Sequence, residues 1–214
     1  MMHIEFLIED QSGKKAMDIL IPKILGNGAT YKIHSYKGIG HLPKGLHPKS
    51  SANKRILLDQ LLKLLCGYGK TPGIDAVIIV CDLDDKDKEQ FLSELNRVLD
   101  ACHSKPKVTY FCLAIEEFEA WYLGDLDAIR KAYPQAKNIV LNGYINDSIC
   151  GTWELLADAI YKGGHQALLN KGWQIVGQYK SMWAEAISLH MNVEENKSPS
   201  FQIMYTRLKK LILS

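Results

Sequence analysis

Acidic side chains follow three apolar segments of the chain, each of which is predicted to form a strand. Glu9 follows residues 3–8, Asp82 and Asp84 follow residues 77–81, and Glu117 and Glu119 follow residues 107–115. Short runs of branched apolar residues are typical of strands buried on both faces of a parallel sheet. Because catalytic groups and ligands collect at the carboxyl edge of such sheets, we expect these acids to converge there.

Carboxylates without a cluster of Cys and His residues favour Mg²⁺ or Mn²⁺ over zinc. If the extended backbone continues through Asp82 and Asp84, both side chains point the same way, and we predict that both bind the cation. Glu9 is predicted to be a further ligand or the base that activates water. Glu117 and Glu119 lie two residues apart and cannot share a helix face, so one of them, with Glu117 slightly favoured, reaches the metal.

We assign Glu9, Asp82, Asp84 and Glu117 to catalysis, and the same four residues with Glu119 to metal binding. Any one of these acids could instead be an ordinary solvated residue at the start of a helix. The agreement of three strands favours a site. Two cations held by shared carboxylates would stabilise the attacking and leaving oxygens in phosphodiester cleavage.

A basic segment accompanies the acids. No Asp or Glu occurs between Asp18 and Asp59, whereas lysines recur through that stretch. Any single lysine could be a solvated surface residue, but the set without intervening acids favours a polyanion such as DNA or RNA. The residues predicted to contact nucleic acid are Lys14, Lys37, His41, Lys44 and Lys49.

Strands and helices are predicted to alternate over the first two thirds of the chain. This order predicts an α/β fold with a mainly parallel sheet flanked by helices. Beyond Pro134 helical patterns dominate, with a short strand possible at 138–141. We therefore predict an α/β domain at 1–134 and a helical C-terminal region at 135–214 packed on it. Ser12 is the expected N-cap of the first helix, which Pro22 should kink or shorten.

Composition excludes several classes of protein. No run of some 18 apolar residues occurs, so no spanning helix is expected. The first residues lack the pattern of a signal peptide, and the five cysteines show no C-x-x-C pair, so a cytoplasmic location is expected. Residues 67–71 contain a Gly-Lys-Thr-like stretch, but it follows a helix and leads into a strand, so it is no phosphate-binding loop.

The acids also resemble a known pattern. A glutamate after the first strand and an Asp-x-Asp after a later one are similar to the TOPRIM fold of topoisomerases, primases and OLD-type nucleases. More closely, the chain resembles an uncharacterised bacterial TOPRIM-like family related to OLD-type nucleases and often encoded near ATPases in defence loci. The segments that carry this resemblance are 7–9, 37–42, 81–84, 115–121, 183–185 and 198–201. It implies a Rossmann-like TOPRIM fold, a Mg²⁺-dependent nuclease of bacterial defence and a partner ATPase.

One departure from the nuclease pattern keeps an alternative open. Related nucleases often have Glu-Gly-x-Thr/Ser-Glu after the first strand, whereas Asp10 replaces the glycine here and Gly13 the second glutamate. Asp10 could partly compensate for the lost acid. The alternative is a catalytically degenerate regulatory or assembly subunit that binds a partner protein. A receiver domain with Asp82 as phosphoacceptor is disfavoured, because no later strand is followed by Lys-Pro.

Overall fold

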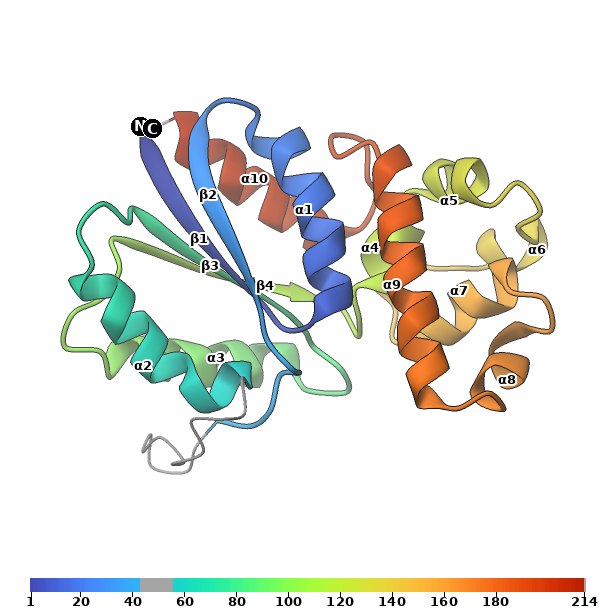
Figure 1. Cartoon of the computed structure of the whole chain (residues 1–214), viewed down its shortest axis with the longest axis horizontal. Helices are drawn as coiled ribbons and strands as arrows, with labels where there is room; N and C mark the ends of the chain where they lie inside the picture. The colour runs from blue at the N-terminus through green and yellow to red at the C-terminus, as the bar shows by residue number, and fades with distance from the viewer. Residues whose placement is uncertain (43–55, 214) are drawn as a thin grey trace.

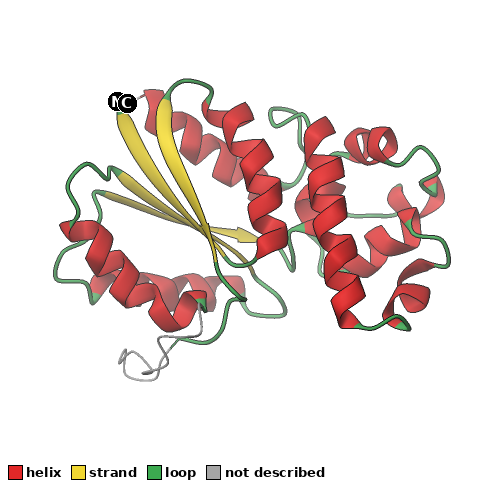
Figure 2. Cartoon of the chain, in the orientation of Figure 1, coloured by secondary structure: helices red, strands yellow, loops and turns green. Residues whose placement is uncertain are grey.

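A computed structural model describes residues 1–42 and 56–213, and it contains one parallel sheet. The four strands lie in the order β2-β1-β3-β4, and every neighbouring pair is parallel. Their bounds are β1 Met2–Ile8, β2 Ala29–Ser35, β3 Ala76–Asp82 and β4 Val108–Ala114. All four carboxyl ends therefore lie at one edge of the sheet (Figure 2). The predicted α/β class and mainly parallel sheet are confirmed.

Helices cover both faces of the sheet and gather beyond its carboxyl edge. In Figure 1, α2 and α3 lie on one face, α1 and α10 lie on the other, and α4 to α9 lie beyond the strand ends. The bounds of the helices are α1 Gln11–Leu25, α2 Leu57–Lys70, α3 Lys88–Asp100, α4 Glu119–Leu123, α5 Leu126–Ala132, α6 Asn138–Leu141, α7 Thr152–Ile160, α8 Gly164–Leu169, α9 Trp173–His190 and α10 Pro199–Leu213. No helix within 1–42 or 56–213 is both long and apolar enough to cross a membrane.

The central strands are buried on both faces, as their apolar composition predicts. Ile78 and Val80 of β3 belong to the core shared with α1 and α10, whereas Val77 and Ile79 belong to the core under α2 and α3. Burial of each such side chain contributes about 1.5–3 kcal/mol to folding. The first core also contains Phe201 of α10, so the C-terminal helices share a hydrophobic core with the sheet. The division at residue 134 stays a prediction.

Two local expectations are wrong, and a third is wrong in part. The N-cap of α1 is Asp10 rather than Ser12, because α1 begins at Gln11 and Ser12 therefore lies inside the helix. The Asp10 carboxylate accepts from the Gly13 N–H (2.7 Å) and from the Ser12 hydroxyl (2.6 Å). Pro22 does not shorten α1, which continues to Leu25, and a kink at Pro22 stays a prediction. Only the N–H that would bond the carbonyl of exposed Asp18 is lost. Residues 138–141 form the short helix α6 rather than a strand.

Candidate functional site

Three of the predicted acids meet at the carboxyl edge of the sheet. Glu9 follows β1, Asp82 ends the adjacent strand β3, and Glu119 opens α4 after β4. The Asp82 backbone N–H donates to Glu9 Oε2 over 2.9 Å, which fixes the Glu9 side chain across the two strands. The charges of Glu9 and Glu119 both raise the pKa of Asp82. We call these three residues, together with Glu117, which shares an ion pair to Lys180 with Glu119, the acid cluster.

Asp84 lies at the border of this cluster rather than beside Asp82. Its φ of 53° is left-handed, so the extended geometry that would align it with Asp82 ends before it. The Asp84 carboxylate forms an ion pair with Lys86. Its negative charge still raises the pKa of Glu9. Asp84 is therefore close enough to act on Glu9, but it is already paired with a lysine.

A lysine that the sequence did not single out lies among the acids. Lys180 of α9 places its Nζ 3.1 Å from Glu117 Oε1 and 3.4 Å from Glu119 Oε2, and its side chain is only 19% exposed. The charges of Glu119, Glu117 and Asp82 raise the pKa of Lys180 against the opposing effect of burial. The ammonium group is therefore the fixed counter-charge of the acid cluster.

Burial raises the pKa of every member of the acid cluster. The pKa of Glu9 and that of Glu119 each rise to about 7, mainly because burial disfavours the carboxylate. The same cause raises the pKa of Asp82 well above its usual value and also raises that of Glu117. One lysine therefore does not neutralise the cluster, and a further cation would find a favourable electrostatic environment.

Several oxygens of the cluster are available to such a cation. The buried atoms Asp82 Oδ1, Glu117 Oε2 and Glu119 Oε2 have no hydrogen-bond partner, although Lys180 forms an ion pair with Glu119 Oε2 without hydrogen-bond geometry. Buried carboxylate oxygens without a donor are costly, and a hard divalent cation accepts such ligands. Within the described ranges no three Asp, Glu, His or Cys side chains are already arranged around one metal position. Carboxylate oxygens are the type of ligand that Mg²⁺ and Mn²⁺ prefer, and binding requires the side chains to turn toward the ion.

Glu116 and Glu117, which are adjacent in sequence, have different roles. The Glu116 carboxylate accepts from the backbone N–H groups of Gly151 (2.9 Å) and Thr152 (2.8 Å). These groups lie at the N-terminus of α7, where a negative charge is stabilising. Glu116 is thus a structural acid that holds α7.

The sequence predicts that either Glu117 or Glu119 reaches the metal. Glu119 is 2% exposed, and its charge raises the pKa of Asp82.

The nuclease pattern that the sequence resembles has a second glutamate at the position of Gly13, and the structure leaves no space for a side chain there. A Cβ at position 13 would lie 2.9 Å from Phe118 Cε2 and 3.0 Å from Ile8 Cγ2. The Phe118 ring packs edge-on against Trp121, with centroids 4.7 Å apart, and Trp121 is fully buried. Phe118 and Trp121 are therefore core residues beside the acid-bearing helix α4.

We expect Gly13→Ala to destabilise the protein by about 1–3 kcal/mol, because the added methyl group overpacks the Phe118 ring. Chemical denaturation would measure this loss. Gly177→Ala in α9 is the matched control, since a Cβ there meets no atom within 4 Å and removing a helical glycine is favourable. Equal stability of the two variants would contradict the packing described for Gly13.

The predicted basic residues are placed unevenly. Lys14 forms an ion pair with Asp18 one turn further along α1, over 2.6 Å. Lys37 and His41 are exposed and lie on the segment that follows β2. The Gly38 N–H donates to the Glu9 carbonyl over 3.0 Å, so this segment runs beside the acid cluster. Lys44 and Lys49 lie outside the described residues. Nucleic-acid contact by these residues stays a prediction.

The C-terminal helices hold the acid-bearing segment in place. Trp121 Nε1 donates to Ser200 Oγ over 2.9 Å, and the Trp121 ring packs against Phe201 with centroids 5.5 Å apart. Both partners belong to the 198–201 segment at the start of α10. The helix that begins with Glu119 is therefore fixed by residues about 80 positions later in the chain.

The fold and site define an α/β protein with a carboxylate cluster at the carboxyl edge of a parallel sheet. The chain belongs to the family described as Domain of unknown function (DUF4276), which matches residues 8–209. Neither a curated protein nor a solved structure matches the sequence. The matched range contains every member of the acid cluster and Lys180.

Proposed function

We propose that the protein is a Mg²⁺- or Mn²⁺-dependent phosphodiester hydrolase that acts on nucleic acid. The observation that carries this proposal is the group of buried, unpartnered carboxylate oxygens at the edge where parallel sheets bind ligands. The raised pKa values of Glu9 and Glu119 support it, since burial disfavours both carboxylates and a bound cation would offset that cost. The TOPRIM-like relationship and the OLD-type nucleases suggested by the sequence are part of the same proposal.

Asp82, Glu119 and Glu9 would hold the cation, and Asp84 and Glu117 would lie beside these three ligands. The ion would supply positive charge against the phosphate oxygens of the substrate. Glu9, whose pKa rises to about 7, suits the role of a base that takes a proton from water near neutral pH. The exposed Lys37 on the segment beside Glu9 would contact the phosphate backbone.

A second candidate is a subunit of the same fold without catalytic activity, which binds a partner protein such as an ATPase. Two observations favour it. Phe118 occupies the space in which a second glutamate would stand, and Lys180 already supplies a fixed positive charge to Glu117 and Glu119. In such a subunit the acid cluster would be a structural ion-pair network.

Cleavage of labelled single- and double-stranded DNA and RNA with Mn²⁺ tests the proposal. We expect cleavage by the wild type and a fall of about 100-fold or more in Asp82→Asn, because a metal ligand is lost. Asp85→Asn is the matched control, since Asp85 is an exposed acid three residues away and belongs to no part of the cluster. Cleavage that is unchanged in Asp82→Asn would refute the assignment. Metal-dependent stability without cleavage of any substrate would favour the second candidate.

A further inference from the structure

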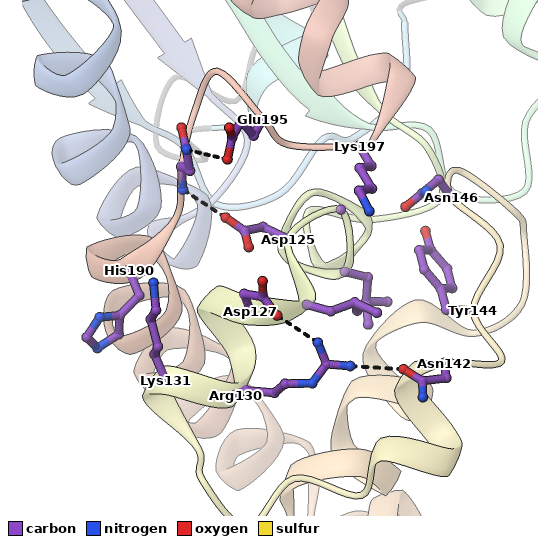
Figure 3. Close-up of a pocket in the computed structure, with 14 residues that line it drawn as sticks. Asp125, Asp127, Arg130, Lys131, Asn142, Tyr144, Asn146, His190, Glu195 and Lys197 are labelled. Carbon is purple, nitrogen blue, oxygen red and sulfur yellow. Dashed lines mark hydrogen bonds and ion pairs between the residues drawn. The ribbon is translucent and has the colours of Figure 1, made fainter.

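A cavity of about 850 Å³ lies apart from the acid cluster. Its walls are the turn between α4 and α5, the segment after α6 and the loop that joins α9 to α10 (Figure 3). We call it the Arg130–Lys197 pocket. None of the acid cluster lines it. Its volume lies in the range of about 300–1,000 Å³ that small-molecule sites occupy.

The acids of the Arg130–Lys197 pocket are engaged in holding its walls. Asp125 Oδ1 accepts from the Ala128 N–H over 3.0 Å, and Asp125 Oδ2 accepts from the Asn192 N–H over 2.8 Å. Glu195 Oε2 accepts from the side-chain amide of Asn192 over 2.8 Å. These carboxylates tie the α4–α5 turn to the loop after α9. Both carboxylates therefore already accept hydrogen bonds within the protein.

Arg130 is held in place by three hydrogen bonds and still has N–H donors without an acceptor among the described residues. Its Nη1 donates to Asp127 Oδ1 over 2.8 Å, its Nη2 to Asn142 Oδ1 over 2.9 Å, and its Nε to Asn138 Oδ1 over 2.8 Å. A guanidinium group carries five N–H donors, so two remain. Because Asn142 turns its oxygen to Arg130, its amide nitrogen is also left as a donor. Figure 3 shows the Arg130 guanidinium directed toward the space that Lys197 enters from the other side.

Two further donors complete the set. The Lys197 ammonium has no acceptor among the described residues, although its backbone N–H bonds Gly124. The Tyr144 hydroxyl accepts from the Asp147 N–H over 3.1 Å, which leaves its own proton to donate. Lys131 and His190 line the same pocket. The lining has three acids, Asp125, Asp127 and Glu195, against Arg130, Lys131 and Lys197, so its formal charges balance. Each of these acids already accepts a hydrogen bond within the protein, whereas Arg130, Asn142, Lys197 and Tyr144 keep free donors.

We propose that the Arg130–Lys197 pocket binds a small phosphate-bearing molecule of about the size of a nucleoside phosphate. A phosphate has several acceptor oxygens and negative charge, which match the pre-positioned fork of Arg130 and the point charge of Lys197. The Tyr144 ring supplies the apolar surface that an organic part of the ligand would contact. This site is independent of the acid cluster and of any cleavage reaction there.

Calorimetric titration of the full chain tests the site, with EDTA present so that the acid cluster holds no metal. The probes are inorganic phosphate, pyrophosphate and ADP, with citrate as a polycarboxylate and sodium chloride matched for ionic strength. We expect pyrophosphate or ADP to bind to the wild type. Both Lys197→Gln and Tyr144→Phe should raise the dissociation constant, and Lys197→Gln should raise it about tenfold. Lys63→Gln is the control, because Lys63 is an exposed lysine of α2 outside the pocket.

Three results would overturn the proposal. The first is no binding of any phosphate compound at millimolar concentration. The second is equal binding by the wild type and Lys197→Gln, which would place the phosphate elsewhere. The third is tighter binding of citrate than of the small phosphates. None of these results would affect the cleavage assay, so the failure of one proposal can be told from the failure of the other.

Discussion

Lys180→Met is expected to destabilise the protein by about 3 kcal/mol at neutral pH, because it leaves buried carboxylates without their counter-charge. The lysine ammonium is paired with both Glu117 and Glu119, and the Lys180 side chain is 19% exposed. Methionine keeps most of the packed side chain and removes only the charge. Since the pKa of Lys180 is raised in the folded protein, its full stabilisation is present at neutral pH and is lost only in strong alkali. Urea denaturation at neutral pH would measure the loss.

The control for Lys180→Met is a second substitution that removes a buried carboxylate left without its lysine partner. We expect Lys180→Met combined with Glu119→Gln to recover part of the lost stability, because the neutral amide does not need the ammonium. Lys15→Met matches the charge change at an exposed ion pair with Glu185 and should change stability by less than about 1 kcal/mol. A Lys180→Met protein as stable as the wild type would contradict the described ion pairing of Lys180 with Glu117 and Glu119.

The stability of the metal-free protein is expected to fall as the pH rises from about 4.5 to about 7. The folded-state pKa values of Glu9 and Glu119 rise to about 7 from an ordinary value of 4.5. Between these limits the folded state binds more protons than the unfolded state, so deprotonation favours unfolding. Other carboxyls whose pKa is lowered, such as Asp158, lose their stabilisation only at more acidic pH. Thermal melts in EDTA across this range would measure the slope.

A divalent cation should reverse this loss. Mg²⁺ bound only by the folded state raises the melting temperature, and the rise should be larger at pH 8 than at pH 5 because protons compete for the same carboxylates. Glu9→Gln should flatten the pH slope and reduce the effect of Mg²⁺. The matched control is Glu89→Gln, which changes an exposed acid of α3. A Mg²⁺ effect that is the same at both pH values would argue against binding by these acids.

Much of the fold follows from local composition. The apolar run at 77–81 predicts a doubly buried strand, and β3 occupies 76–82. The order of strands and helices predicts the parallel sheet, and parallel strands necessarily bring Glu9 and Asp82 to the same edge. The existence of the acid cluster could therefore be inferred before any coordinates. Asp84 could not be placed, because a left-handed φ at a single residue leaves no sign in the sequence pattern.

The parts that depend on distant contacts could not be predicted. Lys180 is 63 positions from Glu117, and only the docking of α9 brings them together. One signal was present: Lys180 follows the buried Val176 by four residues and precedes the buried Trp183 by three, so it lies on the apolar face of its helix. A lysine on a buried face needs a partner. The close contact between Gly13 and Phe118 likewise becomes visible only in three dimensions.

Titration of the metal-free protein with Mn²⁺ by calorimetry at pH 8 tests the central claim most directly, because that claim is a cation site in the acid cluster. We expect saturable binding by the wild type, loss of that binding in Asp82→Asn, and wild-type binding in the control Asp85→Asn. Both variants remove one carboxylate near the end of β3, so a difference between them reports the position of the ion. Absence of binding by the wild type, or equal binding by the two variants, would contradict the claim.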